Sequence, residues 1–355
     1  MGVRATGVTG TRAGSAQTAR APVALPATLV LVGAVSVQSG AGLAARLFSE
    51  LPPAAVTTLR LWAAALVMLL IAGRAAARAV AGLAARRAWA DGVITLAFGL
   101  TLGFMNFAIY QAFARIPLGI AVTIEFLGPL SVTVAGTLTD ARRASASRAS
   151  AGGGAVSGAR AMLLAGLGYA TLAAAGVVLL AGGVGTTGLN WAGVAWAAAA
   201  GAAWAGYIVG SKAAGQRLPG ASGLVIAMCV AAVAVTAPGL AAGGTAMFRP
   251  RFLAIGAGIG LLSSVVPYWL ELETLRRIPA RLFGVWMSVQ PAVAALIGLA
   301  ILGQRLSPAE WAGIACVVAA SAGAAAAARP AAAANAAEPG AADLESAVHE
   351  PTRAG

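Results

Sequence analysis

The chain of 355 residues has little charge, two cysteines and a single histidine. Charged residues make up 10% of it, whereas a soluble domain usually has about 25%, so an ordinary soluble fold is excluded. Cys229 and Cys316 both lie in apolar stretches, and two cysteines do not make a disulfide framework. No residue spacing matches a metal site, a phosphate-binding glycine loop or an activated nucleophile. We therefore expect no enzyme activity, no metal, no cofactor and no ATPase module.

Long apolar runs take the place of these features, and 59% of the residues are hydrophobic. A bilayer-spanning helix needs about 20 mainly apolar residues. The sequence predicts an all-α membrane protein with ten transmembrane helices, at about 23–44, 53–73, 92–113, 117–138, 161–181, 190–210, 219–240, 250–271, 281–302 and 308–327. Two apolar runs are each interrupted by a single charged residue: the run 51–73 by Arg60 and the run 116–139 by Glu125.

The net charge is +13, and the basic residues lie between the apolar runs. This distribution favours a role in membrane topology over nucleic-acid binding. With a cytoplasmic N-terminus, cytoplasmic segments hold 18 of the 24 Lys and Arg residues and outside segments hold five. The positive-inside rule therefore predicts that both termini are cytoplasmic. We expect a basic N-terminal segment at 1–22, a flexible cytoplasmic linker at 139–160 and a disordered tail at 328–355, which contains His349.

A short motif occurs twice, as Arg115-Ile116-Pro117 and as Arg277-Ile278-Pro279. Each copy has a further proline twelve residues after the first, and the two copies are offset by 162 residues. Each lies between the third and fourth spans of a five-span half, formed by 23–138 with 161–181 and by 190–327. Because five is odd, the second half must cross the membrane upside down. The pattern predicts two inverted five-helix repeats, a transporter architecture, although chance recurrence of three residues stays an alternative.

Polar side chains on four predicted spans fall in one layer of the membrane. Glu125 and Arg60 lie about 12 and about 10 Å below the predicted outer boundary, at a rise of about 1.5 Å per residue. Gln38 and Asn106 fall at similar depth. A charge at this depth is costly unless it is paired or hydrated, so we expect Arg60 and Glu125 to face a common cavity. One interpretation is a salt bridge that joins helices.

The other interpretation is a substrate site. An α-amino acid carries a carboxylate, which suits Arg60, and an ammonium group, which suits Glu125. Glu125 is also the candidate for the coupling proton, and competition between proton and substrate would give antiport. Glu271 is either a coupling or gating residue or an interfacial partner of Arg276 or Arg277. Trp204 and Tyr207 are either cavity walls or packing aromatics. Small residues at 193, 197, 201 and 205 predict a close-packed helix seam.

Several blocks of the sequence resemble one known family. They include "VSVQSGAGLAARLF" (35–48), "LRLWAAALVML" (59–69), "GFMNFAIYQAFARIPLGIAVTIEFLGPL" (103–130) and the region 261–323. These blocks are similar to the EamA branch of the drug/metabolite transporter superfamily, and within it to the Rht-type threonine/homoserine exporters. The resemblance covers about 25–325. It implies ten helices in two inverted repeats in a bacterial inner membrane, and export of small amino acids or related metabolites, with proton antiport expected.

Carried onto this chain, the resemblance places polar site positions at Gln38, Arg60, Asn106, Tyr110, Glu125, Tyr268 and Glu271. The longer linker and the Ala-rich tail depart from the family pattern. We expect a small-molecule substrate and membrane lipid as partners, and leave open whether the chain forms a homodimer. Two other functions remain open: export of drugs or cationic metabolites, which would not need Arg60, and a membrane scaffold or sensor that acts through its tail.

Overall fold

The computed structural model describes residues 24–150, 157–183, 190–218 and 220–328, and these residues form helices and no strand. The predicted N-terminal segment 1–22, most of the loop after the fifth span and nearly all of the tail lie outside the described residues. The elements are α1 (Ala24–Leu47), α2 (Pro53–Ala85), α3 (Trp89–Phe113), α4 (Leu118–Glu125), α5 (Leu127–Ser150), α6 (Ser157–Gly183), α7 (Trp191–Gly215), α8 (Ser222–Gly243), η1 (Gly244–Phe248), α9 (Pro250–Gly260), η2 (Leu261–Val265), α10 (Val266–Leu275), α11 (Ala280–Met287), α12 (Gln290–Leu302) and α13 (Pro308–Ala327).

Ten helical segments in these described ranges are long and apolar enough to cross a membrane, and they match the ten predicted spans. Three spans are broken into consecutive helices: α4 with α5, α9 with η2 and α10, and α11 with α12. Two helices run past their expected ends. α2 continues to Ala85 and α5 continues to Ser150, into the segment expected to be linker. Both extensions are rich in alanine and arginine, which are strong helix formers even where the chain has left the apolar layer.

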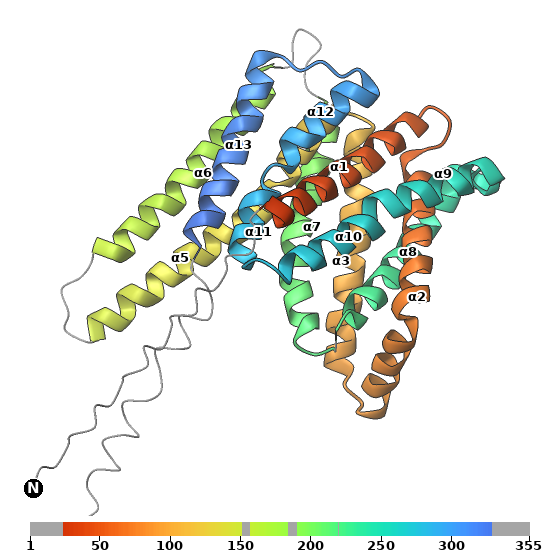
Figure 1. Cartoon of the computed structure of the whole chain (residues 1–355), viewed down its shortest axis with the longest axis horizontal. Coiled ribbons are helices and arrows are strands. Elements are labelled where there is room, and N and C mark those ends of the chain that lie inside the picture. Colours follow the sequence, from red (N-terminus) through yellow and green to blue (C-terminus); the bar gives the residue numbers. More distant parts are fainter. Residues whose placement is uncertain (1–23, 151–156, 184–189, 219, 329–355) are drawn as a thin grey trace, which may run out of the picture.

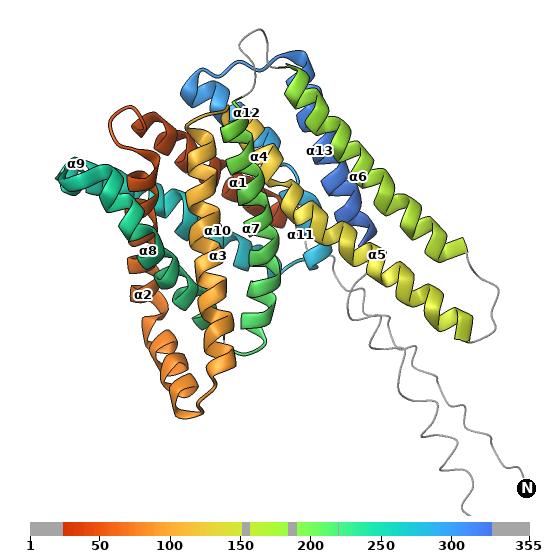
Figure 2. The same cartoon turned by 180° about the vertical axis from the view of Figure 1, so that it is seen from behind.

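The helices pack in matched pairs across the two halves. In the first half, the third span (α3) contacts α7 and α8, which are the first two spans of the second half. In the second half, the third span (α9, η2 and α10) contacts α1 and α2, which are the first two spans of the first half. The pairs α2–α8 and α6–α13 map onto themselves when the halves are exchanged. In both views of the molecule, α5, α6 and α13 form one side and α2, α3 and α8 the other (Figures 1 and 2). The packing is consistent with the inverted repeat, whose upside-down relation stays a prediction.

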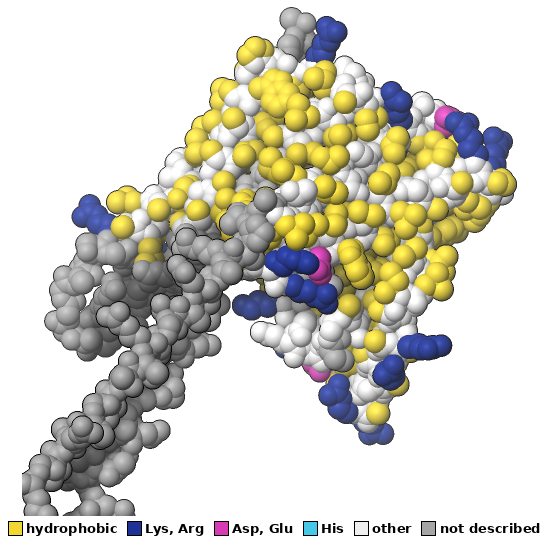
Figure 3. Space-filling model, in the orientation of Figure 1, with side chains coloured by type: hydrophobic (Ala, Val, Ile, Leu, Met, Phe, Trp, Pro, Cys, Tyr) yellow, Lys and Arg dark blue, Asp and Glu magenta, His cyan; other side chains and the backbone are white. Residues whose placement is uncertain are grey.

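Hydrophobic side chains cover most of the face seen in Figure 3, and Lys and Arg side chains gather at its edges. Large apolar residues on the outer helix surfaces are well exposed, among them Leu70, Val178 and Val233, at 78, 69 and 74%. Such a continuous apolar surface would be unstable in water and is expected where a protein faces lipid.

Polar contacts between loops show which loops share a face. At one end, Arg251 forms an ion pair with Glu50 at 2.8 Å, and the Arg46 side chain donates to the Ile301 carbonyl oxygen at 2.8 Å. At the other end, Arg217 forms an ion pair with Asp91 at 3.0 Å. The first group joins loops predicted to be outside and the last joins loops predicted to be cytoplasmic. The grouping agrees with the predicted topology, while the orientation in the membrane stays a prediction.

Candidate functional site

Glu125 lies at the break in the fourth span. Pro117 precedes α4 with φ −54° and ψ 142°, and α4 ends at Glu125. Pro129 has no N–H, so the Glu125 carbonyl oxygen cannot receive the usual helical hydrogen bond from four residues on. The backbone of α7 comes close to this point, because a Cβ built on Gly201 would lie 2.8 Å from that oxygen. The break and the close contact together hold the Glu125 side chain at a fixed depth.

The small-residue seam on α7 provides this close contact. A Cβ on Gly193 would lie 2.7 Å from the Ile116 side chain, and Ala197 is fully buried. Together with Gly201, these residues let α7 lie directly against the start and the end of α4. The predicted close packing of the seam is confirmed at these three positions.

Arg60 lies near the start of α2, seven residues after Pro53, and is held by the broken eighth span. Its Nη2 donates to the Ser263 carbonyl oxygen at 3.2 Å and to Ser264 Oγ at 3.4 Å, and its guanidinium carbon lies 5.2 Å from the centre of the Tyr110 ring. Ser263 and Ser264 belong to η2, a single π-helical turn. Because Pro267 has no N–H, the Ser263 carbonyl oxygen has no helical donor four residues on and is available to Arg60.

Arg60 and Glu125 line the same small cavity, of about 110 Å³, which is also bordered by Gln38, Asn106 and Tyr110. The five side chains are buried, with exposed fractions between 1 and 8%. Within the described part of the chain, no nitrogen–oxygen distance of 4.0 Å or less joins Arg60 to Glu125. The structure therefore brings the two predicted charges to one cavity without the direct salt bridge of the architectural interpretation.

A second cavity, of about 380 Å³, meets the first at Gln38, Glu125 and Trp204. Its lining includes Tyr268 and Glu271, so all eight predicted site residues border one or both cavities. Trp204 is half-buried and packs edge-on against Phe126, with ring centres 5.0 Å apart, so it is both a packing aromatic and a cavity wall.

The two cavities lie toward opposite ends of the bundle. The larger one is lined by Phe283 and Gly284 at the start of α11, next to the basic loop with Arg276 and Arg277. The smaller one is lined by Tyr110 and Phe113 at the end of α3. With the predicted orientation, the larger cavity lies on the cytoplasmic side of Glu125 and the smaller one on the outer side.

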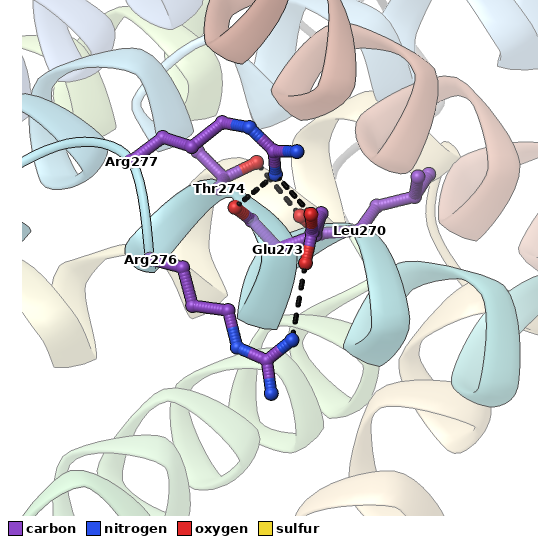
Figure 4. Close-up of polar contacts among 5 residues, drawn as sticks. All are labelled: Leu270, Glu273, Thr274, Arg276 and Arg277. Atoms are coloured by element: carbon purple, nitrogen blue, oxygen red, sulfur yellow. Dashed lines mark hydrogen bonds and ion pairs between the residues drawn. The ribbon is translucent and has the colours of Figure 1, made fainter.

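The contacts of the basic loop bear on one of the two alternatives for Glu271, an ion pair with Arg276 or Arg277. Figure 4 shows Arg276 and Arg277 on either side of Glu273, which forms ion pairs with both. Glu273, and not Glu271, is thus the interfacial partner of these arginines. Glu271 is half-buried, lines the larger cavity and has no ion pair among the described residues.

Three residues that hold the site together were missed from the sequence. Gln290 accepts a hydrogen bond at 2.7 Å from Gln38 Nε2, and Ser263 and Ser264 bind Arg60. One signal was available: Pro267 in an apolar span frees the carbonyl oxygen four residues before it, which is that of Ser263. Gln290 directly precedes Pro291 at the equivalent break of the ninth span.

The two cavities together combine charged and polar groups with apolar walls. They present one guanidinium, two carboxylates, amides and hydroxyls in an otherwise apolar wall, with the charges kept apart. This arrangement would suit a small molecule that carries charges of both signs, and Glu125 is the carboxylate that borders both cavities.

Comparison with known proteins agrees with this architecture. Residues 191–325 match the model of the EamA-like transporter family. The chain is 32% identical to the threonine/homoserine exporter RhtA of Escherichia coli K12 over 85% of this chain and 92% of that protein. It is also 32% identical to the protein of the same name from Salmonella typhimurium LT2 over 86 and 93%. The chain belongs to the EamA-like transporter family.

A solved crystal structure shares the fold. It is 21% identical, covers 84% of this chain and 96% of the other, and has a TM-score of 0.50. Family membership makes the chain a transporter with a multi-pass membrane fold.

Proposed function

We propose that this transporter exports small amino acids of the threonine and homoserine kind, or closely related metabolites, across a bacterial inner membrane. The observation that carries the proposal is the arrangement of Arg60 and Glu125, which border one buried cavity and do not touch each other. A dipolar amino acid placed between them satisfies both charges. An empty cavity leaves both charges only partly compensated, at a cost of several kcal/mol.

Arg60 binds the substrate carboxylate and Glu125 binds the ammonium group. A guanidinium and a carboxylate form paired, charge-assisted hydrogen bonds with these groups. Glu125 binds either a proton or the substrate ammonium, so that entry of one requires release of the other. Competition of this kind couples substrate export to proton entry by antiport, and Glu271, on the cytoplasmic side, passes the proton to and from Glu125.

Alternating access follows from the two broken spans that cross at the site. α4 and α12 pack against each other on the predicted outer side, whereas the larger cavity reaches toward the predicted cytoplasmic loops. In this state the site is closed to the outside and loads from the cytoplasm. Rocking one half against the other would open the site to the outside and close it to the cytoplasm. Both termini stay in the cytoplasm throughout. The relatives' names are those of threonine/homoserine exporters, which supports the same substrate class.

The test is export of labelled threonine and growth on toxic threonine or homoserine in cells that express the wild type, Glu125→Gln or Arg60→Ala. We expect the wild type to raise tolerance and lower the internal amino acid level, and both variants to lose the effect. Glu50→Gln is the matched control, because Glu50 is a surface carboxylate paired with Arg251 outside the cavity. Normal export by Glu125→Gln would refute the mechanism.

The same strains separate the competing functions. A site for purely cationic solutes needs Glu125 but gains nothing from Arg60, so Arg60→Ala would keep export of organic cations. A scaffold or sensor would tolerate both cavity variants and fail on deletion of 328–355. An amino-acid exporter instead keeps its transport activity when that segment is deleted.

A further inference from the structure

Buried polar atoms without a hydrogen-bond partner gather around the two cavities. Among the described residues, four buried side-chain atoms have no partner: Arg60 Nε, Tyr110 Oη, Ser263 Oγ and Ser321 Oγ. The first three belong to residues that line the smaller cavity, and Ser321 lines the larger one. Native proteins pair nearly all buried polar groups, and exceptions commonly mark functional sites. The unpaired atoms therefore point to a ligand.

The three unpaired atoms around the smaller cavity can all donate a hydrogen bond. Arginine has only donors, and the tyrosine and serine hydroxyls can each turn a proton toward an acceptor. The ligand group that suits three donors beside a fixed positive charge is an anion with several lone pairs. A carboxylate has two oxygens with about four acceptor sites, and its size suits a cavity of about 110 Å³.

The surrounding backbone keeps these donors in place. The Ser263 and Ser264 groups hold one end of the Arg60 guanidinium and leave Nε unpaired. The Tyr110 ring lies against the same guanidinium and is 1% exposed. Ser263 Oγ sits in a notch made by Gly40, where a Cβ would come within 2.1 Å of it. Side chains fixed in this way form a site before the ligand arrives, which lowers the cost of binding.

The charges divide the combined cavity into two ends. Arg60 and Tyr110 border only the smaller cavity and Glu271 only the larger one, whereas Ser263 and Glu125 border both. We propose that Tyr110 and Ser263, together with Arg60 Nε, form a carboxylate subsite that makes a free carboxylate obligatory in the transported molecule. The substrate then lies with its carboxylate toward the end of α3 and its ammonium group toward Glu125. This inference rests on the proposed function, because it names the residues that select its substrate class.

The subsite predicts which amino acid derivatives are rejected. An amide at the carboxyl carbon has one oxygen, no negative charge and two extra donors that would face the donors of the protein. Threoninamide keeps the ammonium group and side chain of threonine, so it probes the carboxylate subsite alone. A site that lacked this recognition would accept both molecules about equally.

The experiment uses the full chain in proteoliposomes and measures how unlabelled threonine or threoninamide inhibits counterflow of labelled threonine. We expect threoninamide to inhibit the wild type at least about 100-fold more weakly than threonine. Tyr110→Phe and Ser263→Ala should each raise the threonine concentration for half-inhibition about 10- to 100-fold, the loss expected for a hydrogen bond to a charged group. In these two variants the threoninamide concentration for half-inhibition should stay the same. The ratio between the half-inhibiting concentrations of threoninamide and threonine should therefore fall.

Two matched variants control for folding. Tyr169→Phe removes a hydroxyl from α6 and Ser222→Ala removes one from a buried serine of α8, and neither residue lines the cavities. Both should discriminate as the wild type does. Equal inhibition by the two compounds in the wild type, or unchanged discrimination in both test variants, would overturn the subsite. Failure of the wild type to transport any amino acid would instead overturn the proposed function.

Discussion

The two copies of the repeated motif start alike and end in different surroundings. α4 follows Pro117 and α11 follows Pro279, with ψ of 142° at both prolines, and each helix has eight residues before a break. Every residue of α4 is buried. In α11, by contrast, residues 282–287 are only half-buried, and several of them line the larger cavity.

The same backbone arrangement, a proline followed by an eight-residue helix, is thus tightly packed in one copy and loosely packed in the other. α4 packs against α12 so closely that a Cβ on Gly119 would lie 2.7 Å from the Ala295 Cα, and the Leu118 N–H donates to Gln304 Oε1 at 2.9 Å. With the predicted orientation, the tightly packed copy seals the outer side and the loosely packed copy borders the cytoplasmic cavity. Exchange of these two environments would give the opposite state of an alternating-access transporter.

The copies also differ in their chemistry. Met287 is the residue 162 positions after Glu125, so the second copy has a thioether where the first has the carboxylate. Met287 borders the larger cavity only, whereas Glu125 also borders the smaller one, with Arg60. Of the two copies of the motif, only the first thus carries a carboxylate at this position.

The largest effect is expected from removing this chemical difference. Glu125→Met should lower threonine export at least about 100-fold, because it leaves the buried Arg60 without any carboxylate across the cavity. Adding Met287→Glu to that variant should not restore export, since the new carboxylate would border a different cavity from Arg60. Export per amount of protein in the membrane is the measurement, and recovery in the double variant would contradict a role confined to the first copy.

A disulfide between α4 and α12 should lock the tightly packed copy in place. A Cβ on Gly298 would lie 3.4 Å from the Leu118 Cβ, close to the separation of about 3.5–4.5 Å in disulfides. With Cys229 and Cys316 changed to serine, the pair Leu118→Cys and Gly298→Cys should form a disulfide on oxidation and lose export in proportion to the cross-linked fraction.

Reduction of the same sample is the internal control for this cross-link and should restore export. Each single-cysteine variant should be indifferent to the oxidant. Full transport by cross-linked protein would mean that α4 and α12 need not separate, and the alternating-access account of the two copies would be wrong.

A smaller effect is expected at a glycine found in only one copy. A Cβ on Gly128 would lie 2.0 Å from the Gly201 carbonyl oxygen, whereas the aligned position in the second copy is Gln290. Gly128→Ala must push α5 away from α7, and overpacking of this kind costs about 1–3 kcal/mol. The melting temperature in detergent should fall. Gly136→Ala, on the same helix with open space around it, should leave it unchanged or raise it.

Much of the fold could be predicted from the sequence, because long apolar runs and loop charges report directly on membrane crossing. The ten spans were predicted, and the repeated proline motif marked equivalent positions in the fourth and ninth spans, but the breaks in these spans were not predicted. The break at η2 was missed, because a π-helical turn has no periodic signal of its own. The extension of α2 to Ala85 was missed because hydropathy records where a span leaves the membrane and not where its helix ends.

The site was predictable in its charges and less so in its support. Arg60 and Glu125 stood out as isolated charges in apolar runs, and depth alone placed them in one layer. Which side chains hold Arg60 depends on the approach of two helices more than 200 residues apart in sequence, with Ser263 and Ser264 in the contact. The contact between these two helices cannot be predicted from the sequence of either span alone. The role of each cavity residue in binding stays a prediction.

The most direct test of the central claim is whether threonine displaces a proton from Glu125. Threonine is added to purified protein in weakly buffered solution, and proton release is recorded together with threonine binding. The account predicts that the wild type releases protons as it binds threonine, and that Glu125→Gln releases none at a threonine concentration that still gives binding. Binding by the wild type without proton release, or equal release by Glu125→Gln, would contradict it.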